Sequence, residues 1–151
     1  MGMDAPQRMM LYHTFQNGRE PITCRPDAAS LLRIPKQDSN ETVPLLGYWE
    51  VDRSTESLNQ VKSKLPGYAM FLKMQAYRRH WPELTQPAVR IFFVCQSQER
   101  MANVIDAITG LPAANAFRFC IQGDLEPKDL LNEPIWLATD GQRRAIIRAS
   151  Q

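Results

Sequence analysis

The chain has 151 residues, of which 44% are hydrophobic and 23% are charged, an ordinary composition for a single globular domain. No apolar run approaches the roughly 20 residues needed to cross a bilayer, so the composition argues against a membrane protein and a cytoplasmic location is expected. The net charge of only +2 is not the strong positive field typical of many nucleic-acid-binding proteins.

Residues 1–151 are expected to form one α/β domain. The N-terminus lacks the basic and then apolar layout of a signal peptide, and Met-Gly-Met is typical of an internal start, which leaves open an upstream domain in a longer protein. Cys24, Cys95 and Cys120 are widely spaced in apolar stretches and form no Cys-x-x-Cys motif. This pattern predicts buried, reduced thiols rather than a metal site.

The first third of the chain predicts strands. A turn at Gly18 and Pro21 and the polar loop 35–42 separate these strands, and Pro26 interrupts the second of them. The segments that read as strands are 9–15, 22–34 and 43–52. The last of these is the clearest, because it is apolar until it reaches two acidic residues.

A helix is predicted to begin at Ser57, because Gln60 three residues later completes a capping box. An apolar stripe at helical spacing follows it, formed by Leu58, Val61, Leu65, Tyr68 and Leu72. Pro66-Gly67 must interrupt or kink this helix, since proline lacks the amide hydrogen and clashes with the preceding turn. The pattern continues to about Trp81, where Pro82 ends it.

The second half of the chain alternates strands with a helix. The continuous apolar run 89–95 is typical of a strand covered on both faces. Residues 98–108 predict a helix and residues 116–121 another strand, while 134–138 and 145–147 are candidate edge strands. The order β-β-α-β-α-β predicts an α/β fold whose central sheet is mixed, partly parallel and flanked by helices.

Acidic residues gather where the strand 43–52 ends. Glu50 and Asp52 are two apart, so they share one face of that strand, and two neighbouring like charges repel unless a cation or base lies between them. Carboxylates in this position suit a hard divalent cation such as Mg²⁺. Alternatively, the acids only solvate the strand end and favour the positive N-terminus of the next helix.

Asp27 adds a third carboxylate, because a hairpin would place it beside the strand that carries Glu50. Lys62 and Lys64 flank the apolar stripe of the next helix, so that one of them is expected to reach the acids. Metal-dependent phosphodiester cleavage needs carboxylates for the metal and a cation near the attacking water or the phosphate. The sequence therefore contains the components of such a site.

Several segments resemble the replication-relaxation proteins of bacterial plasmids and mobile elements. The most specific is Tyr48–Glu56 (YWEVDRSTE), and the others are Arg25–Ala28 (RPDA), Lys64–Tyr68 (KLPGY) and Arg90–Val94 (RIFFV) with its sequel Ser97-x-Glu99-Arg100. The resemblance covers about residues 22–108. It implies a role in plasmid replication or DNA relaxation, often with a winged-helix domain upstream.

The same residues resemble a rearranged PD-(D/E)XK nuclease site. Pro26-Asp27 matches the first motif and Glu50-x-Asp52 the second, but Asp52 stands where that motif has lysine. The resemblance implies a restriction-endonuclease-like core with Mg²⁺ held by Asp27, Glu50 and Asp52. Lys64, or else Lys62, would supply the missing lysine from the following helix.

Three functions are consistent with these features. The first is a Mg²⁺-dependent DNA nuclease or nickase whose catalytic residues are Asp27, Glu50, Asp52 and Lys64. The second is a catalytically inactive, nuclease-like module that binds DNA through its basic residues. The third is a protein-interaction subunit of a mobile-element complex. DNA or a protein of that complex is the expected partner, and no membrane contact is expected.

Overall fold

The computed structural model describes residues 11–147, which begin with a separate β-hairpin. Strands β1 (His13–Asn17) and β2 (Glu20–Cys24) pair antiparallel and form a sheet of their own. The predicted strand 9–15 therefore begins later than expected, and its first two residues lie outside the described range. Gly18 forms the turn in the left-handed conformation, with φ of 64°, whereas Pro21 belongs to β2 rather than to the turn.

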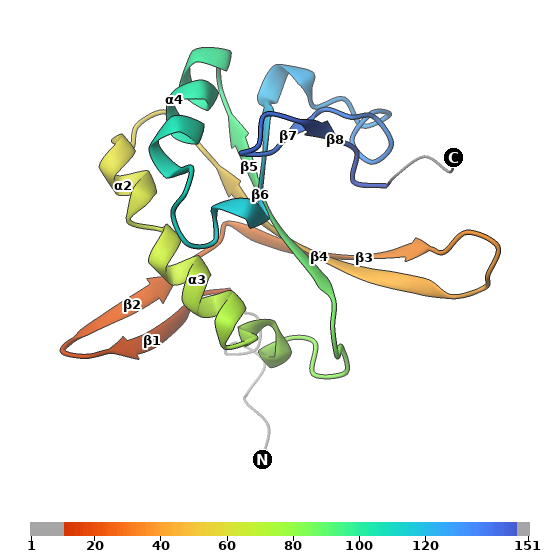
Figure 1. Ribbon diagram of the computed structural model, residues 1–151, viewed down its shortest axis with the longest axis horizontal. Coiled ribbons are helices and arrows are strands. Elements are labelled where there is room, and N and C mark those ends of the chain that lie inside the picture. Colours follow the sequence, from red (N-terminus) through yellow and green to blue (C-terminus); the bar gives the residue numbers. More distant parts are fainter. Residues whose placement is uncertain (1–10, 148–151) are drawn as a thin grey trace.

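The second sheet has six strands and is mixed, as the sequence predicts (Figure 1). Its strands, in spatial as well as chain order, are β3 (Ala28–Pro35), β4 (Thr42–Val51), β5 (Ala88–Cys95), β6 (Phe117–Ile121), β7 (Trp136–Leu137) and β8 (Arg143–Arg144). The pairs β4–β5 and β5–β6 are parallel, and the other pairs are antiparallel. The last strand precedes the predicted 145–147, so that prediction was wrong.

Strands β3 and β4 form a long hairpin that projects from the body of the molecule (Figure 1). The predicted strand 22–34 is in fact two strands, β2 and β3, which belong to different sheets. Pro26 lies between them and has no amide hydrogen to donate to a ladder. The chain therefore changes sheets at Arg25–Asp27, immediately before it enters the hairpin.

Two helices follow the predicted boundaries, but the prediction that helix continues to about Trp81 was wrong. The α-helix ends at Lys73, because Gln75 takes a left-handed conformation with φ of 52° and only a short 3₁₀ helix follows. Helix α2 (Leu58–Lys62) begins after Ser57, whose capping box with Gln60 is present. Helix α3 (Leu65–Lys73) starts anew with Pro66 in its first turn, which confirms the predicted interruption. Helix α4 (Gln98–Ile108) has the predicted bounds. The short 3₁₀ helices are η1 (Ala76–Arg79), η2 (Ala114–Ala116) and η3 (Gln122–Asp124).

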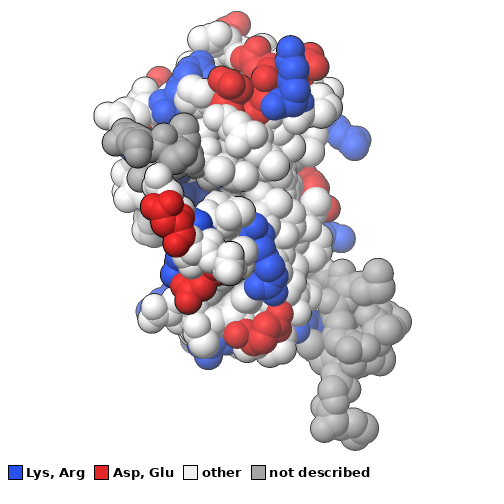
Figure 2. Space-filling model, turned by 90° about the vertical axis from the view of Figure 1, so that its right-hand side faces the viewer, with Lys and Arg blue, Asp and Glu red and all other residues white. Residues whose placement is uncertain are grey.

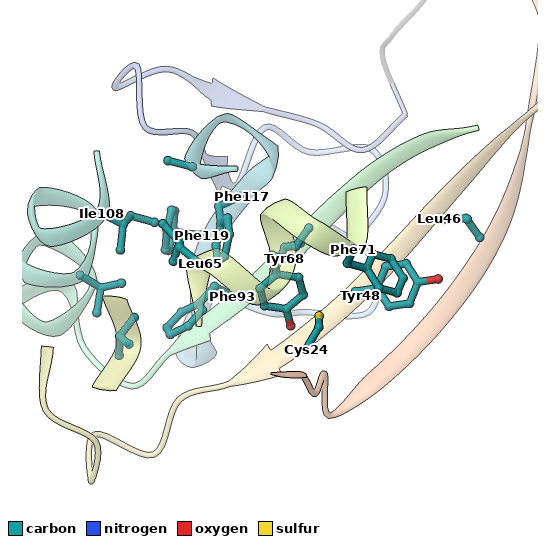
Figure 3. Packing of buried hydrophobic residues seen from close by; sticks show 14 of the residues in the cluster. Cys24, Leu46, Tyr48, Leu65, Tyr68, Phe71, Phe93, Ile108, Phe117 and Phe119 are labelled. Carbon is teal, nitrogen blue, oxygen red and sulfur yellow. The ribbon is translucent and has the colours of Figure 1, made fainter. Parts of the chain in front are cut away.

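The large sheet has a hydrophobic cluster on each face. The larger cluster packs the sheet against α2, α3 and α4, and Figure 3 shows its aromatic residues Phe93, Phe117 and Phe119 gathered beneath the helices. The smaller cluster contains Phe92 and Trp136, and residues of the C-terminal segment 122–147 cover it. Helices of the described chain therefore cover one face, while irregular chain covers much of the other. All three cysteines are buried and free, as predicted.

Helix α3 lies unusually close to β2 because residue 67 is glycine. A Cβ atom at Gly67 would be 2.5 Å from the carbonyl oxygen of Thr23 and 3.2 Å from the Cα of Cys24. Glycine permits this approach of a helix to a strand. It brings Tyr68 of α3 beside Cys24 of β2, as Figure 3 shows. The described residues include no helix long and apolar enough to cross a membrane.

Candidate functional site

The hairpin places Asp27 beside the end of β4, as expected from the sequence. The amide of Asp27 donates to the carbonyl of Trp49 at 2.8 Å, and the amide of Val51 donates to Asp27 Oδ2, also at 2.8 Å. The first bond fixes the Asp27 backbone and the second its carboxylate, on either side of Glu50. The strand pairing β3–β4 thus joins two carboxylates that are 23 residues apart in the sequence.

Glu50 is buried, with 4% of its surface exposed, and its partners come from helix α3 and from the residue that precedes it. The Tyr68 hydroxyl donates to Oε1 at 2.5 Å and the Lys64 ammonium donates to Oε2 at 3.1 Å. Burial raises the pKa of Glu50 above its ordinary value, and the negative charge of Asp27 adds to that effect, although Tyr68 and Lys64 oppose it. The ionised form of Glu50 is therefore stabilised by its contacts with Tyr68 and Lys64, against the effect of burial.

Lys64, rather than Lys62, is the lysine that reaches the acids. Its ammonium group bridges Glu50 and Glu56, with a distance of 2.9 Å to Glu56 Oε1. Burial alone would lower the pKa of Lys64, but these two carboxylates raise it above its ordinary value, so the side chain remains charged. Lys62 instead lines an apolar hollow beside α3 and residues 111–112.

Asp52 shares the helix-covered face with Glu50, but its carboxylate is bound to Arg100 of α4. Arg100 Nε donates to Oδ2 at 2.7 Å and Nη2 donates to Oδ1 at 3.1 Å, which is a bidentate ion pair. The same Nη2 donates to the carbonyl of Glu56 at 2.8 Å. Asp52 does not line the cleft that holds Asp27 and Glu50, so a role as third metal ligand would require this ion pair to open.

A cleft of about 700 Å³ lies over Asp27 and Glu50. Its charged lining consists of three carboxylates and three cations: Asp27, Glu50, Glu56, Arg25, Arg53 and Lys64. Arg25 and Arg53 are exposed, whereas Glu50 is buried. The cleft therefore combines a buried carboxylate with exposed guanidinium groups, a combination suited to a cation and to a phosphate.

Mg²⁺ is commonly held by one or two carboxylates together with water and substrate phosphates. Asp27 and Glu50 fit that requirement, and a cation there would compete with Lys64 for Glu50 Oε2. Among residues 11–147, no group of three His, Cys, Asp or Glu side chains is placed to hold a metal ion. The candidate ligands that line the cleft are therefore Asp27 and Glu50, with Asp52 paired elsewhere.

Sequence reasoning assigned Tyr68 to the apolar face of its helix and missed its polar contact. A usable signal was present, because Tyr68 follows Lys64 by four residues and such side chains lie on the same helix face. Arg100 was recognised only through a resemblance. Its pairing with Asp52 spans 48 residues and has no local sequence signal.

Replacing Tyr68 with phenylalanine is expected to lower the free energy of unfolding at pH 7 by about 1.5–3 kcal/mol, the usual range for a hydrogen bond to a charged group. The bond favours ionised Glu50, whose pKa is raised above its ordinary value of 4.5 by burial. The difference from wild type should therefore be present above the folded-state pKa of Glu50 and decrease as the pH falls through it. Urea unfolding over a pH series measures this, and Tyr77→Phe is the matched control. A loss independent of pH would contradict the assignment.

Comparison with protein-family models, with curated proteins and with solved structures finds no match to this chain. The resemblance to the replication-relaxation proteins therefore remains a prediction from the residues quoted for it. A function for this chain is therefore to be inferred from the cleft that contains Asp27, Glu50 and Lys64.

Proposed function

We propose that this chain is a DNA-processing protein related to the replication-relaxation proteins and that the Asp27–Glu50 cleft is its phosphodiester-cleaving site. The observation that carries the proposal is the convergence of Asp27, Glu50 and Lys64 in one cleft from three separate parts of the chain. Asp27 precedes β3, Glu50 lies near the end of β4, and Lys64 immediately precedes α3. The expected setting is the cytoplasmic processing of plasmid or mobile-element DNA.

The order of elements supports a restriction-endonuclease-like core. An antiparallel hairpin carries the first acid at its beginning and the second at its end, and the chain then passes through helices to the parallel strand β5. This is the arrangement that the PD-(D/E)XK resemblance implies. Lys64 takes the place of the missing motif lysine, because it donates to the Glu50 carboxylate.

In this proposal Asp27 and Glu50 would hold a divalent cation. Such a cation supplies Lewis-acid polarisation of the phosphate and activation of water. Lys64, held in its charged form by Glu50 and Glu56, places a positive charge beside the reacting group rather than accepting a proton. Arg25 and Arg53 contribute exposed guanidinium groups at the cleft for phosphate contacts.

Supercoiled plasmid with Mg²⁺ or Mn²⁺ tests this proposal. We expect the wild type to nick the plasmid, and Asp27→Ala, Glu50→Ala and Lys64→Met each to lower the rate by about 10² or more, as loss of a group stabilising transition-state charge does. The matched control is Asp106→Ala, which removes an exposed carboxylate on α4 outside the cleft. Retained nicking in Asp27→Ala or Glu50→Ala would reject the site, and no nicking by the wild type would reject the activity.

The second candidate is an inactive nuclease-like module that binds DNA or a protein of a mobile-element complex. The ion pair between Asp52 and Arg100 favours it, because a carboxylate expected at the metal is already bound. This candidate predicts salt-sensitive DNA affinity that neither Mg²⁺ nor Asp27→Ala changes. Tight protein association without DNA affinity would favour the interaction subunit instead.

A further inference from the structure

The Asp27–Glu50 cleft has a recessed floor and an exposed rim. Three residues of its lining are almost fully buried, with exposed fractions of 2%, 4% and 1%: Cys24, Glu50 and Tyr68. Val51 and Arg53 also line the cleft but are exposed, Val51 with 51% of its surface. A phosphate that reaches the Glu50 carboxylate must therefore pass below the rim.

The size of the cleft also limits what can enter it. A volume of about 700 Å³ is that of a site for a single small molecule. A DNA duplex is stiff over about 150 base pairs and cannot bend one phosphate sharply into such a recess. Enzymes that need a recessed part of a duplex must first unpair or extrude a nucleotide, and a strand that is already unpaired avoids this cost.

An exposed aromatic ring adjoins the cleft. His13 pairs with Cys24 at the end of the β1–β2 hairpin, so Tyr12 and Arg25 are the next residues of the two segments. His13 and Cys24 are buried, whereas Tyr12 and Arg25 are exposed, since successive side chains alternate between faces. The Arg25 guanidinium carbon lies 5.8 Å from the centre of the Tyr12 ring, and Tyr12 is 40% exposed. Because Arg25 lines the cleft, this ring lies beside its entrance.

Two arginines of the cleft have no acidic partner in the described chain. Within residues 11–147, neither Arg25 nor Arg53 forms an ion pair. The third cation, Lys64, instead bridges Glu50 and Glu56. Arg25 follows β2 and Arg53 follows β4, so two guanidinium groups from separate segments can donate to phosphate oxygens.

We propose that the substrate of this cleft is an unpaired DNA strand, with a base stacked on Tyr12 and phosphates bound by Arg25 and Arg53. Proteins that bind single strands combine aromatic side chains for stacking with cations for the backbone. Duplex binding needs a more extended basic surface, and on the face that Figure 2 shows, the described acidic and basic side chains are interspersed. The inference rests on the proposed function, because it names the substrate of the same site.

Fluorescence anisotropy with a labelled 12-residue oligothymidylate tests the role of Tyr12. EDTA in the buffer excludes both cleavage and metal binding. We expect Tyr12→Ala to weaken binding about tenfold, as loss of one stacked base does, without changing the slope of log K against log salt. Tyr12→Phe retains the ring and should bind within about twofold of wild type. The matched control is Met74→Ala, which truncates a 61% exposed side chain outside the cleft.

The arginine variants should respond differently from the tyrosine variant. Arg53→Gln is expected to reduce the salt slope by about 0.7, the value of one single-strand phosphate contact. Arg33→Gln, which changes an exposed arginine of β3 outside the cleft, should leave the slope unchanged. Misfolding would not separate the two responses, because it would remove stacking and phosphate contacts together.

Three results would overturn the proposal. The first is unchanged affinity in Tyr12→Ala, and the second is a duplex of the same length bound as tightly as the single strand. The third is Arg53-dependent binding of a Glu-rich peptide without oligonucleotide binding, which would indicate an acidic protein partner instead.

The substrate proposal and the cleavage proposal fail separately. Tyr12-dependent oligonucleotide binding by a protein that nicks no DNA would support the strand-binding site and reject the cleavage activity. Nicking that requires Asp27, is equally fast on duplex and single-stranded DNA and is unaffected by Tyr12→Ala would reject the substrate proposal alone.

Discussion

Replacing Arg100 with methionine is expected to lower the free energy of unfolding by about 3–5 kcal/mol, which is the usual cost of leaving one charge of a buried ion pair uncompensated. The Asp52 side chain is 1% exposed and Arg100 14% exposed. Arg100 donates to both carboxylate oxygens of Asp52, and only Oδ1 has a further donor, the amide of Ser54 at 3.3 Å. The carbonyl of Glu56 loses a donor as well. Urea denaturation at pH 7 measures the loss.

The double variant Asp52→Leu/Arg100→Met is the control for that experiment. Replacing both charges by apolar groups removes the uncompensated carboxylate, so most of the lost stability should return. A loss below about 1 kcal/mol in the single variant would show that the pair behaves as an exposed one. Because Arg100 also holds the backbone at Glu56, the single variant should loosen the wall of the cleft that carries Arg53 and Glu56.

Truncating Trp136 to alanine is expected to cost about 3–5 kcal/mol, the range for removing a large buried aromatic side chain. Trp136 is 1% exposed, and its ring lies 4.8 Å from that of Phe92 and 5.7 Å from that of Trp49, between centroids. Its indole Nε1 also donates to the carbonyl of Leu130 at 3.1 Å. Strand β7 has only two residues, so the C-terminal segment depends on this side chain.

Trp136→Phe is the matched variant for this prediction. It keeps an aromatic ring against Phe92 but loses the indole donor to Leu130, so its loss should be clearly smaller. Thermal and urea unfolding of both variants measure the difference. Near-zero loss in Trp136→Ala would mean that the segment 122–147 unfolds separately from the sheet.

Local signals in the sequence determined the elements that depend on neighbouring residues. The capping box at Ser57 and Gln60 and the interruption at Pro66 were predicted correctly, because capping and proline geometry act within a few residues. Helix α4 was predicted with its observed bounds from the helical spacing of its apolar residues. The mixed sheet followed from the order of the elements, and the place of Asp27 beside β4 followed from one hairpin.

Tertiary structure alone decided the features that join distant parts of the chain. Pro26 divides a stretch predicted as one strand between two sheets, since each half finds a different pairing partner. Asp52 follows Glu50 by two residues, yet the two carboxylates have different partners. Glu50 accepts from Lys64 and Tyr68. Asp52 binds Arg100 of a later helix. The choice of Lys64 over Lys62, which the sequence left open, is decided by the contacts of Lys64 with Glu50 and Glu56.

The sequence also contained no signal for the groove of about 340 Å³ that three arginines line. Arg90, Arg118 and Arg144 come from three strands and meet only because the sheet aligns those strands in one register. The sequence by itself therefore determined which segments become helices and strands and which acids are candidates for chemistry. The tertiary structure decided which charges meet, because long-range pairing and burial, rather than local propensity, select the partner of each charged side chain.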